Sequence, residues 1–171
     1  MSYAVDRQWS ERFIPSIKKV IGPLLLEAAP LDLDRNEATD LMVFCARDMR
    51  IGARVRKREH FEKYAGDFTI RCARDSGAKT ELAKIVDGWG DWMFYGFANA
   101  AEDQIDHWRI IDLSAFRAAL IRHNMNGQQI RYQTISNGDG TYFRAFDVRS
   151  FDWCDPPLMV AASPSLLGNA A

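Results

Sequence analysis

Apolar side chains between Phe13 and Leu25 recur at spacings of three and four residues. This periodicity is typical of an amphipathic helix with one buried face. Pro30 lacks the backbone N–H that a helix interior needs, so the helix ends before it. The sequence therefore predicts one N-terminal helix, followed by an acidic connection over residues 31–39.

Shorter runs in which apolar and polar residues alternate come next and predict strands. Residues 40–45 and 50–57 flank a short charged turn, so we expect them to form a β-hairpin. In the second run Arg54 and Arg56 alternate with small and apolar residues, which puts the two arginines on one face. Residues 67–72 combine β-branched and aromatic side chains and predict a third strand.

The second half of the chain continues with both kinds of pattern. In order, we expect a helix over 80–87, strands over 92–97 and 108–113, a short helix capped by Ser114, and a hairpin over 130–148 around the turn Asn137-Gly138-Asp139-Gly140. The predicted fold is α/β (α+β): a central mixed sheet with flanking helices in the order α-β-β-β-α-β, plus a C-terminal helix and β-hairpin. We assign residues 1–155 to one domain and residues 156–171 to an apolar tail that is flexible or forms an interface.

Composition narrows the class of protein. Hydrophobic residues make up 47% and charged residues 26% of the 171 residues, as in ordinary globular domains. No apolar run approaches the roughly 18 residues that span a bilayer. The polar N-terminal stretch does not resemble a signal peptide. The three cysteines are widely spaced and fit reduced thiols, so we expect a cytoplasmic protein.

Charge is distributed unevenly along the chain. The net charge is −1, but residues 47–84 hold eleven basic and six acidic residues, a local charge of +5. Such a basic segment favours a surface that binds a polyanion. A solvated strand face rich in arginine would produce the same pattern.

The order of elements over about residues 10–113, with Asp40 opening a strand, resembles the PD-(D/E)XK nuclease superfamily, and in particular its archaeal-type Holliday junction resolvases. This resemblance implies a Mg²⁺- or Mn²⁺-dependent phosphodiesterase that acts on duplex or branched DNA as a homodimer, with Asp40 as a metal ligand. In that family the next strand carries an acid-x-Lys motif. Here the triplet is Arg54-Val55-Arg56. A cation therefore stands where the second metal ligand is expected.

Two interpretations of this departure stay open. In the first, the missing carboxylate has moved, and the catalytic set is Asp40, Asp67, Glu81 and Lys84, with Asp40 and Asp67 holding the metal. In the second, the site is inactive and the fold persists as a DNA-binding or protein-interaction and inhibitor module, with Arg54, Arg56 and Arg71 on phosphates. A third class is a structural protein whose C-terminal hairpin and tail form an interface.

Aromatic residues supply a further expectation. Five tryptophans could stack on nucleic-acid bases if they were exposed. Trp89, Trp92 and Trp108 lie in apolar segments, however, so we expect these three in the core.

Overall fold

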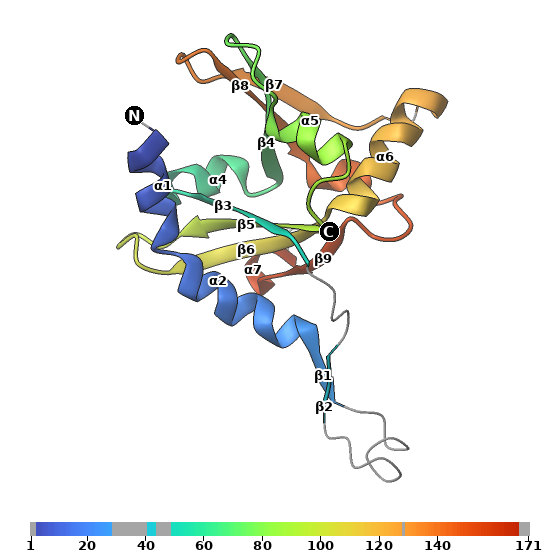
Figure 1. Ribbon diagram of the computed structural model, residues 1–171. Coiled ribbons are helices and arrows are strands. Elements are labelled where there is room, and N and C mark those ends of the chain that lie inside the picture. Colours follow the sequence, from blue (N-terminus) through green and yellow to red (C-terminus); the bar gives the residue numbers. More distant parts are fainter. Residues whose placement is uncertain (1–2, 29–40, 44–48, 128, 168–171) are drawn as a thin grey trace.

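The computed structural model describes residues 3–28, 41–43, 49–127 and 129–167 and has an α+β fold (Figure 1). The helices are α1 (Tyr3–Glu11), α2 (Ile14–Ile21), α4 (Phe61–Tyr64), α5 (Glu81–Val86), α6 (Leu113–Asn126) and α7 (Pro164–Leu167). Short 3-10 turns are η1 (Gly22–Leu25), η2 (Arg58–His60) and η3 (Val148–Phe151). The strands are β1 (Leu26–Ala28), β2 (Leu41–Val43), β3 (Ile51–Arg56), β4 (Asp67–Arg74), β5 (Trp92–Ala98), β6 (Ile105–Asp112), β7 (Tyr132–Ser136), β8 (Thr141–Asp147) and β9 (Met159–Ala162).

A mixed four-stranded sheet in the order β3-β5-β6-β9 forms the centre of the molecule. Strand β3 runs parallel to β5, and the other neighbours are antiparallel. Helix α2 lies across the outer side of this sheet (Figure 1), where Phe13 and Ile17 pack on Phe94 and Ile110. Because the opposite face is also covered, β5 carries a continuous apolar run.

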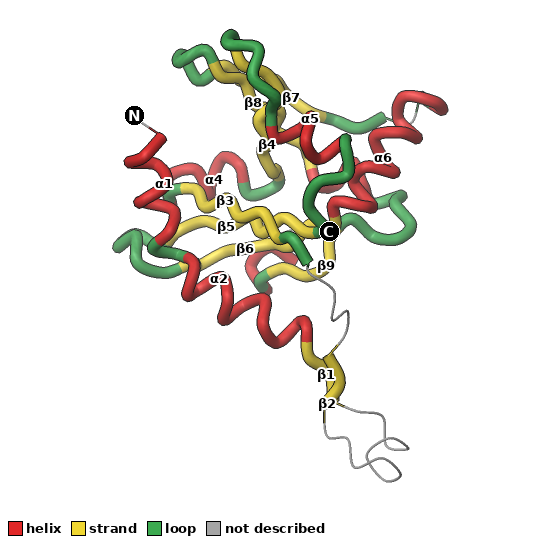
Figure 2. The backbone as a smooth tube through the Cα atoms, viewed as in Figure 1, coloured by secondary structure: helices red, strands yellow, loops and turns green. Residues whose placement is uncertain are grey.

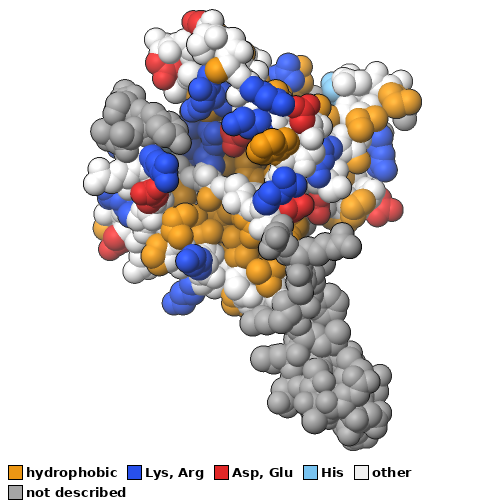
Figure 3. Space-filling model, viewed as in Figure 1, with side chains coloured by type: hydrophobic (Ala, Val, Ile, Leu, Met, Phe, Trp, Pro, Cys, Tyr) orange, Lys and Arg blue, Asp and Glu red, His pale blue; other side chains and the backbone are white. Residues whose placement is uncertain are grey.

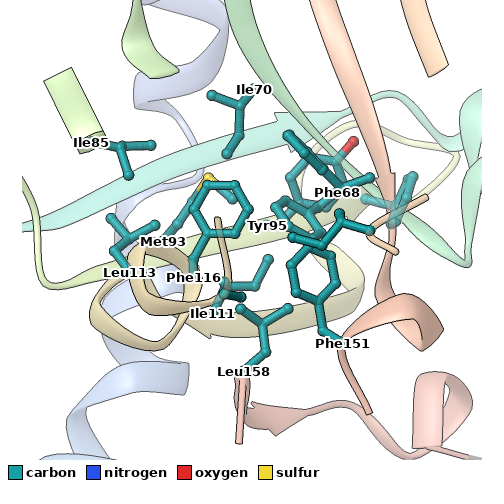
Figure 4. Packing of buried hydrophobic residues seen from close by; sticks show 14 residues of the cluster. Phe68, Ile70, Ile85, Met93, Tyr95, Ile111, Leu113, Phe116, Phe151 and Leu158 are labelled. Atoms are coloured by element: carbon teal, nitrogen blue, oxygen red, sulfur yellow. The ribbon is translucent and has the colours of Figure 1, made fainter. Parts of the chain in front are cut away.

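A second, antiparallel sheet in the order β4-β8-β7 lies over the inner face of the first (Figure 2). Phe68, Phe116, Phe146 and Phe151, all at most 2% exposed, form the aromatic cluster between the two sheets and α6. The Phe68 ring centroid lies 5.6 Å from that of Phe116 and 5.3 Å from that of Phe146. Figure 4 shows Phe68, Phe116 and Phe151 converging with Tyr95 from the central sheet.

The predicted hairpin over 40–57 is wrong. Strand β2 pairs with β1, and β3 pairs in parallel with β5, so that Ile51 lies opposite Trp92. Alternation specifies which face of a strand is buried, but it does not specify the neighbouring strand. In the structure Ile51 and Val55 join the apolar cluster under α2.

The predicted third strand is present as β4, but it lies outside the central sheet because it pairs with β8. The predicted N-terminal helix is present as α2, which begins at Ile14 with a proline in its first turn and continues into η1. Helix α1, which ends at Glu11, was not predicted. The three consecutive strands of a nuclease-like central sheet are therefore not adjacent in this chain.

Other predictions are confirmed. Helix α5 follows Thr80, whose hydroxyl accepts a hydrogen bond from the Ala83 amide at 3.3 Å. The β7–β8 hairpin has the expected position. Helix α6 starts two residues earlier than expected, because its cap is Asp112 rather than Ser114. Within the segment 156–171, β9 forms the edge of the central sheet beside β6.

The aromatic cluster yields a stability prediction. Replacing Phe68 by Ala removes a ring with 0% exposure that joins both sheets, so it should destabilise the protein by about 3–5 kcal/mol. Ile121→Ala is the control, because Ile121 is 58% exposed and should change stability by about 0.5 kcal/mol or less. Urea denaturation measures both. Equal losses for the two variants would contradict the assigned core.

Candidate functional site

A groove lined by cations lies where the two sheets meet α5. Two cavities, of about 470 and 430 Å³, adjoin there because they share Ala53, Arg54 and Arg71. We call this surface the basic groove. Among the described residues that line it, seven are cationic: Arg7, Arg54, Arg56, Arg71, Arg74, Lys79 and Lys84. Figure 3 shows Lys and Arg side chains gathered around a hollow on this face.

Arg54 and Glu81 form an ion pair at the centre of the groove. The Glu81 carboxylate also accepts a hydrogen bond from the Arg71 amide at 3.2 Å. The Phe143 ring contacts both arginines, with its centroid 5.0 Å from Cζ of Arg54 and 5.2 Å from Cζ of Arg71. These contacts hold both guanidinium groups in place by charge pairing and cation–π attraction.

The groove has more positive charge than its own residues neutralise. Burial, and then the positive charges of Arg74 and Arg54, lower the pKa of the Arg71 guanidinium. The buried Nε atoms of Arg71 and Arg74 have no hydrogen-bond partner within the part of the chain that the structure describes. Arginine keeps its proton at neutral pH, so both guanidinium groups stay charged beside the groove and attract an anionic ligand.

The structure brings together some of the predicted site residues. Arg54, Arg56, Arg71, Glu81 and Lys84 all line the basic groove, as expected if these cations contact one ligand. Glu81, however, is bound to Arg54 and is not aligned with a second carboxylate.

The predicted metal ligands do not converge. Asp40 lies outside the described residues. Asp67 starts β4, whereas Glu81 lies beside Arg71, four residues and therefore about 13 Å further along that strand. Among the residues that the structure describes, no group of three His, Cys, Asp or Glu side chains could hold a metal ion.

Asp67 has a different environment from that of a metal ligand. It lies directly opposite Asp147 in the β4–β8 ladder. Burial, and then the negative charge of Asp147, raise the pKa of the Asp67 carboxyl. The positive charges of Arg109 and Arg149 oppose this shift without cancelling it. The folded protein therefore binds the Asp67 proton more tightly than the unfolded chain does.

Sequence reasoning placed Trp89 in the core, and that prediction is wrong, because Trp89 is 59% exposed at the rim of the basic groove. Trp92 and Trp108 do pack against the cluster under α2. Glycines on both sides of Trp89 were the available sign that it belongs to a loop. Arg74, which also lines the groove, was likewise missed.

Comparison with protein-family models, curated proteins and solved structures gives no match to this chain. In the described part of the chain, every helix is too short or too polar to cross a membrane.

The raised pKa of Asp67 predicts a pH-dependent effect on stability. Since the folded state binds this proton more tightly than the unfolded chain, ionisation of Asp67 lowers stability as pH rises above about 4. Asp67→Asn should therefore raise the melting temperature at pH 7 by about 2 °C, and the gain should vanish below about pH 4. Thermal melts across pH measure this. A Mg²⁺-dependent stabilisation that is lost in Asp67→Asn would instead make Asp67 a metal ligand.

Proposed function

We propose that the protein binds nucleic acid through the basic groove and acts as a binding module rather than as a nuclease at this site. The observation that carries the proposal is the excess of cations along the described groove lining, where seven cations accompany one acid, Glu81. Two of the seven, Arg7 and Lys79, pair with Glu11 and Asp87 outside the lining, and Glu81 pairs with Arg54. Such a row of cations suits the phosphate groups of a nucleic acid. Contacts between cations and phosphates supply most of the affinity for nucleic acid that does not depend on its sequence.

Arginine dominates this row, which favours phosphates over isolated small anions. Arg54, Arg71 and Arg74 present forked donors that match phosphate oxygens. Their positions on two different sheets give the groove a length that one small anion would leave mostly empty. A strand of linked phosphates would engage cations at both ends.

Metal-dependent cleavage would need carboxylates that converge on an ion. In the described part of the site, Glu81 is engaged by Arg54, and Asp67 lies opposite Asp147. These contacts favour the binding module. Incubation of the protein with branched, duplex and single-stranded DNA in Mg²⁺ or Mn²⁺ tests this point. Cleavage that Asp40→Ala abolishes would overturn the proposal in favour of the nuclease.

Salt dependence of binding locates the phosphate contacts. Lys84→Ala removes an exposed cation of the groove, so it should weaken binding and reduce the slope of log affinity against log salt by about 0.7–0.9. Lys18→Ala is matched in charge, but Lys18 is an exposed residue of α2, on the other side of the central sheet, and should leave the slope unchanged. Fluorescence anisotropy in a salt series measures both. Equal effects of the two variants would show that the basic groove is not where the phosphates bind.

A substitution of Glu81 should change the affinity for nucleic acid in the opposite direction, towards tighter binding. Glu81→Gln keeps a hydrogen-bond acceptor for the Arg71 amide but removes the charge that pairs with Arg54. The variant should bind nucleic acid several-fold more tightly, because Arg54 becomes available to a phosphate. A catalytic Glu81 would instead show loss of cleavage with no gain in affinity. The same anisotropy titration, run beside a cleavage assay, separates the two outcomes.

A further inference from the structure

Trp89 is a large aromatic side chain that the fold leaves at the surface. It lines the same cavity as Arg71, Arg74 and Lys84, and it is 59% exposed. Most exposed apolar residues need no explanation, but an exposed indole beside a row of cations combines two properties that few ligands satisfy together. Figure 3 shows hydrophobic side chains directly beside the Lys and Arg cluster on this face.

The loop that carries Trp89 is fixed on both sides. Gly88 and Gly90 have φ angles of 90° and 79°, in the left-handed region that glycine adopts without strain. The Trp89 amide donates to the Lys84 carbonyl at 3.0 Å. A side chain at position 90 would come within 2.9 Å of a methyl carbon of Leu113, so the backbone there lies tightly against the core. The backbone that carries Trp89 is thus held in place before any ligand arrives.

We propose that the basic groove takes single-stranded nucleic acid and that Trp89 stacks on one of its unpaired bases. This inference rests on the proposed function and names the class of nucleic acid. In a duplex the base faces already stack on one another, and a protein reaches only base edges in the grooves. In a single strand the faces are free, and aromatic side chains beside a cationic groove bind them with little regard to sequence.

The cations and the indole would contact different parts of the bound strand. Arg71, Arg74 and Lys84 would contact the phosphates, while Trp89 at the rim receives a base turned away from the backbone. The groove then distinguishes strands by base accessibility rather than by charge, which duplex and single strand share. DNA and RNA single strands both offer this chemistry, and the experiment includes both.

The test uses the full chain and labelled oligo(dT) and oligo(U) of about ten nucleotides, within the usual site size for such grooves, beside a duplex of equal length. Wild-type protein should bind a single strand more tightly than the duplex. Trp89→Ala should weaken single-strand binding about tenfold and leave duplex affinity and the salt slope unchanged. Trp89→Phe should restore most of the lost affinity, because it keeps an aromatic face.

Val86→Ala is the matched control, since Val86 is 56% exposed on the adjoining helix but does not line the basic groove. It should bind like wild type. If Trp89→Ala binds single strands normally while Lys84→Ala does not, the stacking role is wrong and the proposed function stands. If wild-type protein binds no oligonucleotide at low salt, both proposals are overturned.

Discussion

One aromatic cluster fixes how the two sheets of this protein are placed. Phe68 of β4, Phe116 of α6, Phe146 of β8 and Phe151 of η3 pack in one cluster with Tyr95 and Phe97 of β5, in the central sheet. Burial of apolar area drives their association, and the preference of rings for edge and offset contacts restricts the geometry. Because β4 is fixed over the central sheet in this way, its polar end lies beside β3, and the basic groove forms between them.

The arginines that line the basic groove repel one another, and neighbouring residues of the chain reduce this repulsion in part. Glu81 pairs with Arg54, and Phe143 supplies a ring face to Arg54 and Arg71. A phosphate in the groove would add further charge-assisted hydrogen bonds to these guanidinium groups. The described groove lining nevertheless keeps more cations than acids, which favours an anionic ligand.

Local elements were predictable from the sequence, and long-range partners were not. The hydroxyl of Thr80 as a helix cap and the glycine-rich turn of the β7–β8 hairpin act over a few residues, so their signals are visible in the sequence. Arg54 could be assigned to a strand face, but its partner Glu81 comes from another element that only tertiary packing brings near. The same reason explains why the strand over 67–72 was expected in the central sheet, whereas β4 pairs with β8. Trp89 is a different case, because the glycines beside it were a local sign of a loop.

The pairing pattern of the strands also sets the kinetics of folding. Strand β4 pairs with β8, and β6 pairs with β9. In both pairs, other elements of the chain lie between the two strands in the sequence. Closing such long loops costs entropy before any contact repays it, so topologies of this kind fold slowly. Until β8 arrives, the hydrogen-bonding edge of β4 and its apolar side chains stay open to other molecules. Partly folded chains with this open edge are therefore prone to aggregate before β8 is in place.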